Sequence, residues 1–105
     1  MAFSLEQLDE RVALRSIASP DESYTAKLLK DGIDRCARKF GEEAIETIVS
    51  AVGRDKTGVR NEAADVFYHL LVLLKASGVP LADVMGELDR RTAMSGIEEK
   101  ASRSR

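Results

Sequence analysis

Residues 61–74 read Asn61-Glu62-Ala63-Ala64-Asp65-Val66-Phe67-Tyr68-His69-Leu70-Leu71-Val72-Leu73-Leu74, and this stretch decides the fold. Placed on a helix over residues 59–77, its apolar side chains cover most of the circumference. Such a helix lies in the centre of a core or in a subunit interface. Glu62 and Asp65 stand near its start, on one narrow stripe with His69. Burying an unpaired carboxylate there is costly, so these acids need a cation or hydrogen-bond donors.

A second acidic group lies upstream, in a helix predicted over residues 33–53. The apolar stripe of that helix consists of Ile33, Ala37, Phe40, Ala44, Ile48 and Ala51. Glu43 and Glu46 share a separate sector with Lys39, and Glu42 precedes them. Taken alone, these acids are compatible with an ordinary solvated face. Together with the first group they collect four acids, which repel one another unless a cation lies between them. We therefore predict a divalent metal site.

Ligands that are all oxygen favour Mg²⁺, or Mn²⁺, over zinc and copper. Mg²⁺ also binds substrate phosphates, so the site suits hydrolysis of a phosphate ester or anhydride by activated water. A di-iron bundle is the neighbouring possibility, but it needs a Glu-x-x-His pair on each of two helices, and this chain has one histidine. His69 either orients Asp65 or a metal-bound water, or it is a core histidine with a satisfied hydrogen bond.

Start and stop signals predict three further helices. These cover residues 4–16, opened by a capping box, residues 20–30, opened by Pro20, and residues 80–92, opened by Pro80. Residues 54–58 form a predicted polar turn, and composition alone makes residues 95–105 a frayed tail. We therefore predict an all-α fold: a helical bundle of about five helices in a single domain over residues 1–105.

Composition and charge exclude several classes of protein. The 105 residues are 44% hydrophobic and 32% charged, which is typical of a folded helical domain. The net charge of −2 provides no basic field for nucleic acid. No signal-peptide pattern and no apolar run of about 20 residues occurs, so we expect no membrane association and a cytoplasmic protein. The single Cys36 excludes an intramolecular disulfide and a cysteine zinc site, and no Gly-rich phosphate loop is present.

Three strings of this chain resemble a known family. They are Ser23-Tyr24-Thr25-Ala26-Lys27-Leu28-Leu29, Lys39-Phe40-Gly41-Glu42-Glu43-Ala44-x-Glu46 and the stretch over residues 61–74. The paired spacings Glu43-x-x-Glu46 and Glu62-x-x-Asp65 are similar to the metal-binding signature of the all-α nucleoside triphosphate pyrophosphatases, the MazG-like superfamily. Together the strings resemble the phosphoribosyl-ATP pyrophosphatases of histidine biosynthesis, and the likeness covers nearly the whole chain.

The resemblance implies Mg²⁺-dependent hydrolysis of phosphoribosyl-ATP to phosphoribosyl-AMP and pyrophosphate, the second step of the histidine pathway. It also implies a homodimer with a four-helix-type core. By similarity, the catalytic metal ligands would be Glu43, Glu46, Glu62 and Asp65, with Glu42 beside or behind them. The residues implied at the substrate are Ser23, Tyr24, Thr25, Lys27, Lys39, Asn61, Arg90 and Arg91. Residues 95–103 resemble the family's C-terminal string, which implies a tail that orders on the substrate or on the partner subunit.

Two other functions stay open at this point. A general nucleoside triphosphate pyrophosphatase would share the carboxylates, whereas a non-enzymatic helical dimerisation module would leave them solvated. The helix over residues 59–77 is apolar on more sides than so small a domain can cover, which independently predicts a homodimer. Four carboxylates repel a polyphosphate, so substrate binding should require the metal. The candidates for the remaining neutralisation are Lys27, Lys39, Arg90 and Arg91.

Overall fold

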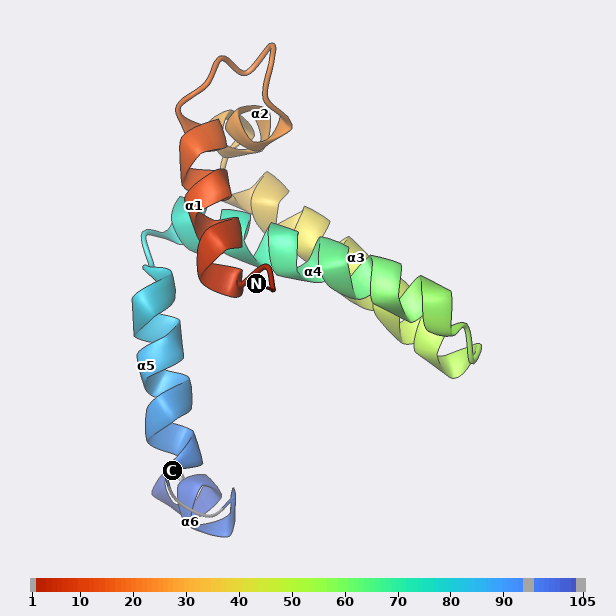
Figure 1. Ribbon diagram of the computed structural model, residues 1–105, viewed down its shortest axis with the longest axis vertical. Coiled ribbons are helices and arrows are strands. Elements are labelled where there is room, and N and C mark those ends of the chain that lie inside the picture. The colour runs from red at the N-terminus through yellow and green to blue at the C-terminus, as the bar shows by residue number, and fades with distance from the viewer. Residues whose placement is uncertain (1, 94–95, 104–105) are drawn as a thin grey trace.

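The computed structural model describes residues 2–93 and 96–103, and its regular elements are all α-helices. The helices are α1 (Leu5–Ser16), α2 (Tyr24–Asp31), α3 (Ile33–Val52), α4 (Lys56–Ser77), α5 (Leu81–Thr92) and α6 (Gly96–Ser102) (Figure 1). The predicted all-α class is confirmed, with one helix more than the predicted five in this described part of the chain.

The two longest helices, α3 and α4, run antiparallel along each other (Figure 1). α1 and α2 pack at the end of this pair where α3 begins and α4 ends. The core lies at that end and consists of Val12, Leu28, Cys36, Leu71, Val72 and Leu81. α5 then leads away from the pair to α6 (Figure 1). The other half of the α3–α4 pair, which we call the arm, therefore projects from the core as two helices.

Two helix starts and ends agree with the sequence signals. The Gln7 amide donates to the Ser4 hydroxyl at 3.1 Å, and the Ser4 amide donates to the Gln7 side chain at 2.8 Å, which completes the predicted capping box. Pro80 occupies the N-cap of α5, as expected for a residue that opens a helix. α3 ends at Gly53, and α4 ends at Gly78 with φ +73°, a left-handed conformation that glycine adopts without steric cost.

The predicted helix start at Pro20 is wrong, because residues 20–22 form a turn. The amides of Glu22 and Ser23 both donate to the Ser19 carbonyl, at 2.9 Å each, and so close that turn around Pro20. α2 begins only at Tyr24, after Ser23 has become the N-cap. Proline is favoured in the first turn of a helix and equally in the second position of a β-turn, and here the turn prevailed.

The predicted polar turn at residues 54–58 is shorter than expected, since α4 begins at Lys56. The Asp55 side chain caps this helix by accepting a hydrogen bond from the Gly58 amide at 2.9 Å. A Cβ atom at position 58 would lie 2.5 Å from that carboxylate and 2.8 Å from the Ser50 hydroxyl. Gly58 thus marks a close approach inside the first helical turn. The turn itself is completed by Arg54, whose φ is +61°.

The predicted apolar stripe of α3 is only partly its buried face. Phe40 and Ala44 are half-buried, but Ile33 and Ile48 are 49% and 61% exposed. The residue of α3 that is fully buried is Cys36. A second apolar surface lies open along the arm, and we call it the arm surface. It consists of Ile45, Ile48, Val49 and Val52, which are between 61% and 74% exposed.

The predicted frayed tail is wrong for the part of it that is described. Residues 96–102 form α6, which contacts α5, while Ser95 and residues 104–105 lie outside the described residues. Among the described residues, no single helix combines the length and apolarity needed to cross a membrane. The bent pair α4 and α5, which turns by 111°, meets those two measures only when both helices are counted.

Candidate metal centre and its surroundings

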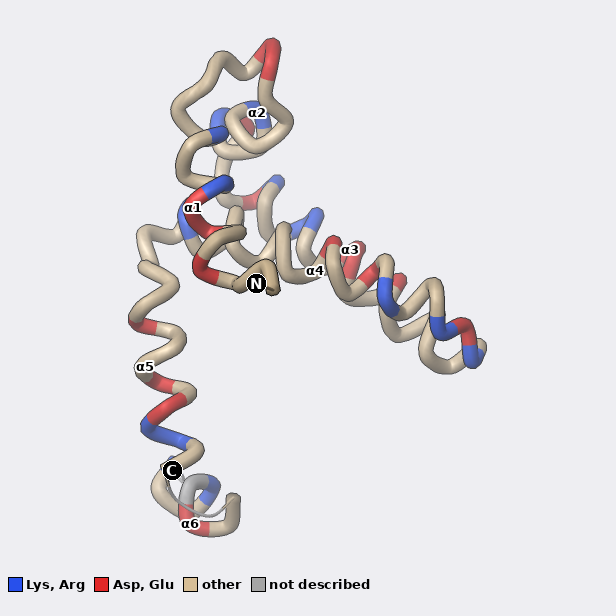
Figure 2. Tube along the Cα trace, viewed as in Figure 1, with Lys and Arg blue, Asp and Glu red and all other residues tan. Residues whose placement is uncertain are grey.

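The antiparallel α3–α4 pair brings the two acidic groups of the sequence to the same level. Carboxylate oxygens of Glu43, on α3, and of Glu62 and Asp65, on α4, lie within 4.8 Å of one another. Figure 2 shows acidic residues gathered part of the way along this pair. Acids three residues apart fall on one face of each helix, so two facing helices can gather them at one point. The three carboxylates together are called the acid cluster below.

The acid cluster has too few hydrogen-bond donors for its oxygens. One oxygen each of Glu43 and Glu62 is buried with no hydrogen-bond partner among the described residues. The pKa of Glu62 is raised to about 7, first because the protonated carboxyl bonds to Glu46, and next because it bonds to Glu43. Burial raises the pKa of Glu43, a hydrogen bond with Glu62 lowers it, and Glu46 and Asp65 raise it further. Unsatisfied oxygens of this kind fit a hard divalent cation, which would replace the shared protons.

Glu46 and Glu42 differ in their relation to the acid cluster. Glu46 reaches Glu62, as its effect on the Glu62 pKa shows, and so borders the cluster. Glu42 instead pairs with Lys39 at 3.2 Å, and this contact raises the pKa of Lys39. The Lys39 side chain is only 22% exposed. A cation is therefore held one helical turn from Glu43, on the same side of α3.

An aromatic group stands on the other side of Lys39. The ring of Tyr68 lies 4.9 Å from that of His69 and 6.5 Å from that of Tyr24, measured between centroids. Burial lowers the pKa of His69, with a further lowering by Lys39, and this favours the neutral imidazole. Its Nδ1 is buried without a partner among the described residues. The sequence reasoning missed Tyr68, although it stands three residues after Asp65, the spacing that places two side chains on one helix face.

The hydroxyls on either side of Tyr24 are already engaged within the protein. Ser23 donates to the Arg15 carbonyl at 2.8 Å and accepts from the Ala26 amide at 3.1 Å. Thr25 is 2% exposed, and its hydroxyl bonds to the Tyr68 hydroxyl at 2.6 Å. These two predicted substrate residues therefore hold α2 against its neighbours.

Two further predicted substrate residues are exposed and make only weak contacts. Lys27 pairs with Asp31 at 3.8 Å, one turn along α2. The side-chain oxygen of Asn61 accepts from Arg60 at 3.2 Å, on the side of α4 near Glu62. Neither contact between exposed groups would hinder a ligand from approaching.

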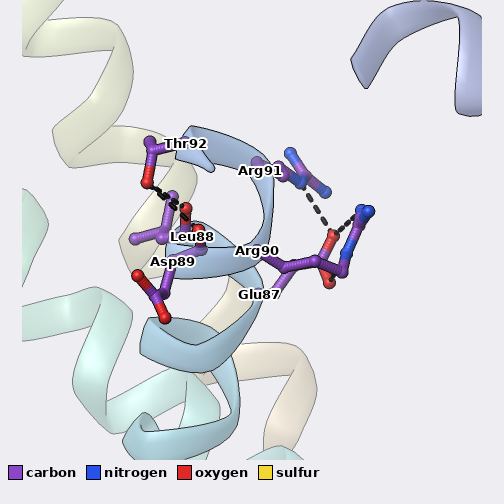
Figure 3. Close-up of polar contacts among 6 residues, drawn as sticks. All are labelled: Glu87, Leu88, Asp89, Arg90, Arg91 and Thr92. Carbon is purple, nitrogen blue, oxygen red and sulfur yellow. Dashed lines mark hydrogen bonds and ion pairs between the residues drawn. The ribbon is translucent and has the colours of Figure 1, made fainter. Parts of the chain in front are cut away.

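Arg90 and Arg91 lie on α5, away from the acid cluster of the same chain. Figure 3 shows both guanidinium groups directed at Glu87, with nitrogen to oxygen distances of 2.7 and 2.9 Å. These bonds lower the pKa of Glu87 to about 2. Because α5 leads away from the α3–α4 pair (Figure 1), neither arginine joins Lys39 within one chain.

Comparison with known proteins gives a consistent assignment. The family model for phosphoribosyl-ATP pyrophosphohydrolase matches residues 5–92, which include α1 through α5. A protein of Agrobacterium fabrum named phosphoribosyl-ATP pyrophosphatase is 55% identical over 102 residues, which are 97% of this chain and 95% of that protein. A protein of the same name from Methylobacterium radiotolerans is 59% identical with the same coverage. One from Rhizobium meliloti is 50% identical over 96% of this chain and 94% of its own length. The chain therefore belongs to the phosphoribosyl-ATP pyrophosphohydrolase family.

Proposed function

We propose that this protein hydrolyses phosphoribosyl-ATP to phosphoribosyl-AMP and pyrophosphate, the second step of histidine biosynthesis, in the cytoplasm. The observation that carries the proposal is the acid cluster on α3 and α4 in a chain of this family. An anhydride with several negative charges can approach such a cluster only if a cation lies between them. A negatively charged nucleotide substrate thus explains why the protein gathers carboxylates that bind a cation.

Glu43, Glu62 and Asp65 would hold the divalent cation, with Glu46 as a fourth ligand and Glu42 nearby. The unpartnered oxygens of Glu43 and Glu62 support this assignment, and the all-oxygen donor set favours Mg²⁺ or Mn²⁺. When bound, a divalent cation supplies positive charge that offsets the phosphates and polarises their oxygens.

The residues of this chain supply the proton acceptor and part of the charge. In the reaction a water oxygen forms a bond to phosphorus, the bridging bond between phosphorus and oxygen breaks, and pyrophosphate leaves. The proton of that water passes to a carboxylate oxygen of the cluster that the cation would leave free, since each carboxylate has two oxygens. Lys39, one turn from Glu43 and largely covered, offsets negative charge on the phosphates.

A homodimer would cover the arm surface, which a single chain leaves in solvent. Phe67 on α4 is also 54% exposed, and Leu88 on α5 is 47% exposed. Apolar residues so placed favour association with a second copy, and a twofold pair is the simplest closed arrangement.

Substrate preference distinguishes this function from that of a general nucleoside triphosphate pyrophosphatase. We expect pyrophosphate release from phosphoribosyl-ATP to exceed release from dCTP and dUTP by at least ~100-fold in kcat/KM, since only the former carries the phosphoribosyl group. A coupled pyrophosphate assay measures all three. Equal rates would favour the general enzyme, and no release from any of them would favour a helical dimerisation module.

Removal of single charges from the acid cluster should abolish turnover while leaving the fold intact. We expect Glu62→Gln and Asp65→Asn each to lower kcat at least ~100-fold, because the amides keep the shape but lose the charge that holds the cation. Helix content by circular dichroism is the control for folding. Near-normal turnover of both variants at saturating Mg²⁺ would show that the assignment of the metal site is wrong.

The raised pKa of Glu62 predicts how the stability of the metal-free protein depends on pH. A carboxyl whose folded pKa is about 7, against a usual 4.5, stabilises the fold below pH 4.5 and loses that contribution as pH rises to 7. The lowered pKa of His69 acts in the opposite direction up to about pH 6.5. The quantity to compare in EDTA is therefore the melting temperature of wild type minus that of Glu62→Gln. This difference should fall between pH 5 and 7, and a constant difference would contradict the shared proton.

The arm surface predicts the oligomeric state. We expect a dimer at micromolar concentration by sedimentation, insensitive to salt because the buried side chains are apolar. Val49→Glu, at a residue 65% exposed in one chain, should dissociate it, whereas Leu14→Glu, at a residue 68% exposed on α1, should not. A monomeric wild type would overturn the prediction, as would a Val49→Glu variant that stays dimeric.

A further inference from the structure

Tyr24 is held rigidly by its neighbours while its own ring stays half open to solvent. The residue before it, Ser23, is tied to α1 through the Arg15 carbonyl. The residue after it, Thr25, is buried and tied to α4 through the Tyr68 hydroxyl. Tyr24 itself is 49% exposed. The string Ser-Tyr-Thr thus contains two anchors and one aromatic side chain whose position they fix.

The ring of Tyr24 also contacts two other aromatic rings, those of Tyr68 and His69. It lies nearly parallel to Tyr68, at an interplanar angle of 19° and a centroid distance of 6.5 Å. It meets His69 edge to face, at 89° and 6.2 Å. Aromatic pairs prefer these offset and edge arrangements, and each adds to the stability of the ring's orientation. The solvent-facing part of Tyr24 therefore belongs to a ring that Tyr68 and His69 contact from the protein side.

Tyr24 is connected to the acid cluster through Lys39 and His69. Lys39 pairs with Glu42, which raises the pKa of that lysine, and Tyr24 is close enough to contribute to the same rise. Lys39 precedes Glu43 by one helical turn, about 6 Å along α3. His69, which contacts Tyr24, follows Asp65 by one turn of α4. The carboxylates, the Lys39 ammonium and the Tyr24 ring thus lie in this order.

A nucleoside triphosphate carries charged phosphates at one end, which suit the metal ligands and Lys39, and a flat base at the other end, which suits an aromatic ring. We propose that the exposed face of Tyr24 is the surface on which the purine base of the substrate stacks, with Ser23, Thr25 and Tyr68 as positioning residues for that ring. This assignment rests on the proposed function and deepens it. Stacking on a tyrosine needs only a π-face and no hydrogen bond from the phenol.

The test separates recognition of the base from recognition of the phosphates. The ligands are α,β-methylene-ATP, which cannot be cleaved between its first two phosphorus atoms, and tripolyphosphate, which has no base. Calorimetry with Mg²⁺ measures the affinity for each. We expect Tyr24→Ala to weaken the nucleotide about tenfold or more and to leave tripolyphosphate unchanged. Tyr24→Phe is the matched control and should bind both like wild type.

The positioning residues have their own readout, which is the ratio of nucleotide affinity to tripolyphosphate affinity. Thr25→Val and Tyr68→Phe remove the hydrogen bond between them with little change of shape, and each should lower this ratio. A purely structural role would lower the melting temperature and leave the ratio unchanged, and that result would overturn their part in positioning.

The remaining outcomes distinguish failure of the stacking surface from failure of the proposed function. If Tyr24→Phe loses affinity like Tyr24→Ala, the phenol hydroxyl acts instead of the ring face, and the stacking assignment is overturned. It is overturned equally if wild type binds both ligands with the same affinity, although the metal site then stands. If neither ligand binds in Mg²⁺ while wild type still hydrolyses phosphoribosyl-ATP, the stacking assignment is overturned and the proposed function stands. If phosphoribosyl-ATP is not hydrolysed either, the phosphate site is refuted, and the proposed function with it.

Discussion

Repulsion between the carboxylates of α3 and α4 is the constraint on which the rest of the structure depends. Carboxylate oxygens of Glu43, Glu62 and Asp65 lie within 4.8 Å of one another, a distance at which like charges repel and raise one another's pKa, as is the case for Glu62. Two helices alone would separate at this point. The fold must therefore supply enough favourable contact elsewhere along the same two helices to keep the charges opposite each other.

That contact is concentrated at one end of the α3–α4 pair. Leu28, Leu71 and Val72 are at most 1% exposed, and full burial of each such side chain contributes about 1.5–3 kcal/mol. α1 and α2 close this end, and the Thr25–Tyr68 hydrogen bond joins α2 to α4 between the core and the acid cluster. The same packing that offsets the repulsion also orients the aromatic group, so the core and the ligand-facing residues are one continuous arrangement.

The all-helical class could be predicted from the sequence because it follows from periodicity, and the capping box at Ser4 marked one helix start correctly. α6 could not be predicted, because its segment is mostly small and polar. The meeting of Glu43 with Glu62 and Asp65 could also be anticipated, since acids three apart on two helices have one way to converge. Competing local hydrogen bonds could not be ranked. Pro20 suits a turn as well as a helix start, and Gly58 suits a turn as well as the first turn of a helix capped by Asp55. Apolar periodicity likewise does not say whether a face such as Ile48 meets its own chain or another.

In the free protein the Lys39 ammonium already binds an anion, the Glu42 carboxylate, as it would bind a substrate phosphate. The Glu42 carboxylate lies 3.2 Å from the Lys39 ammonium, so a phosphate that replaces it at Lys39 exchanges one anion for another. The favourable term in such an exchange is only the difference between the two partners, which is small for a singly charged ligand and larger for a polyanion. Glu42 would therefore lower the net positive charge with which Lys39 attracts a ligand, and this favours ligands of higher negative charge. The chain would achieve selectivity for highly charged nucleotides by keeping its lysine occupied.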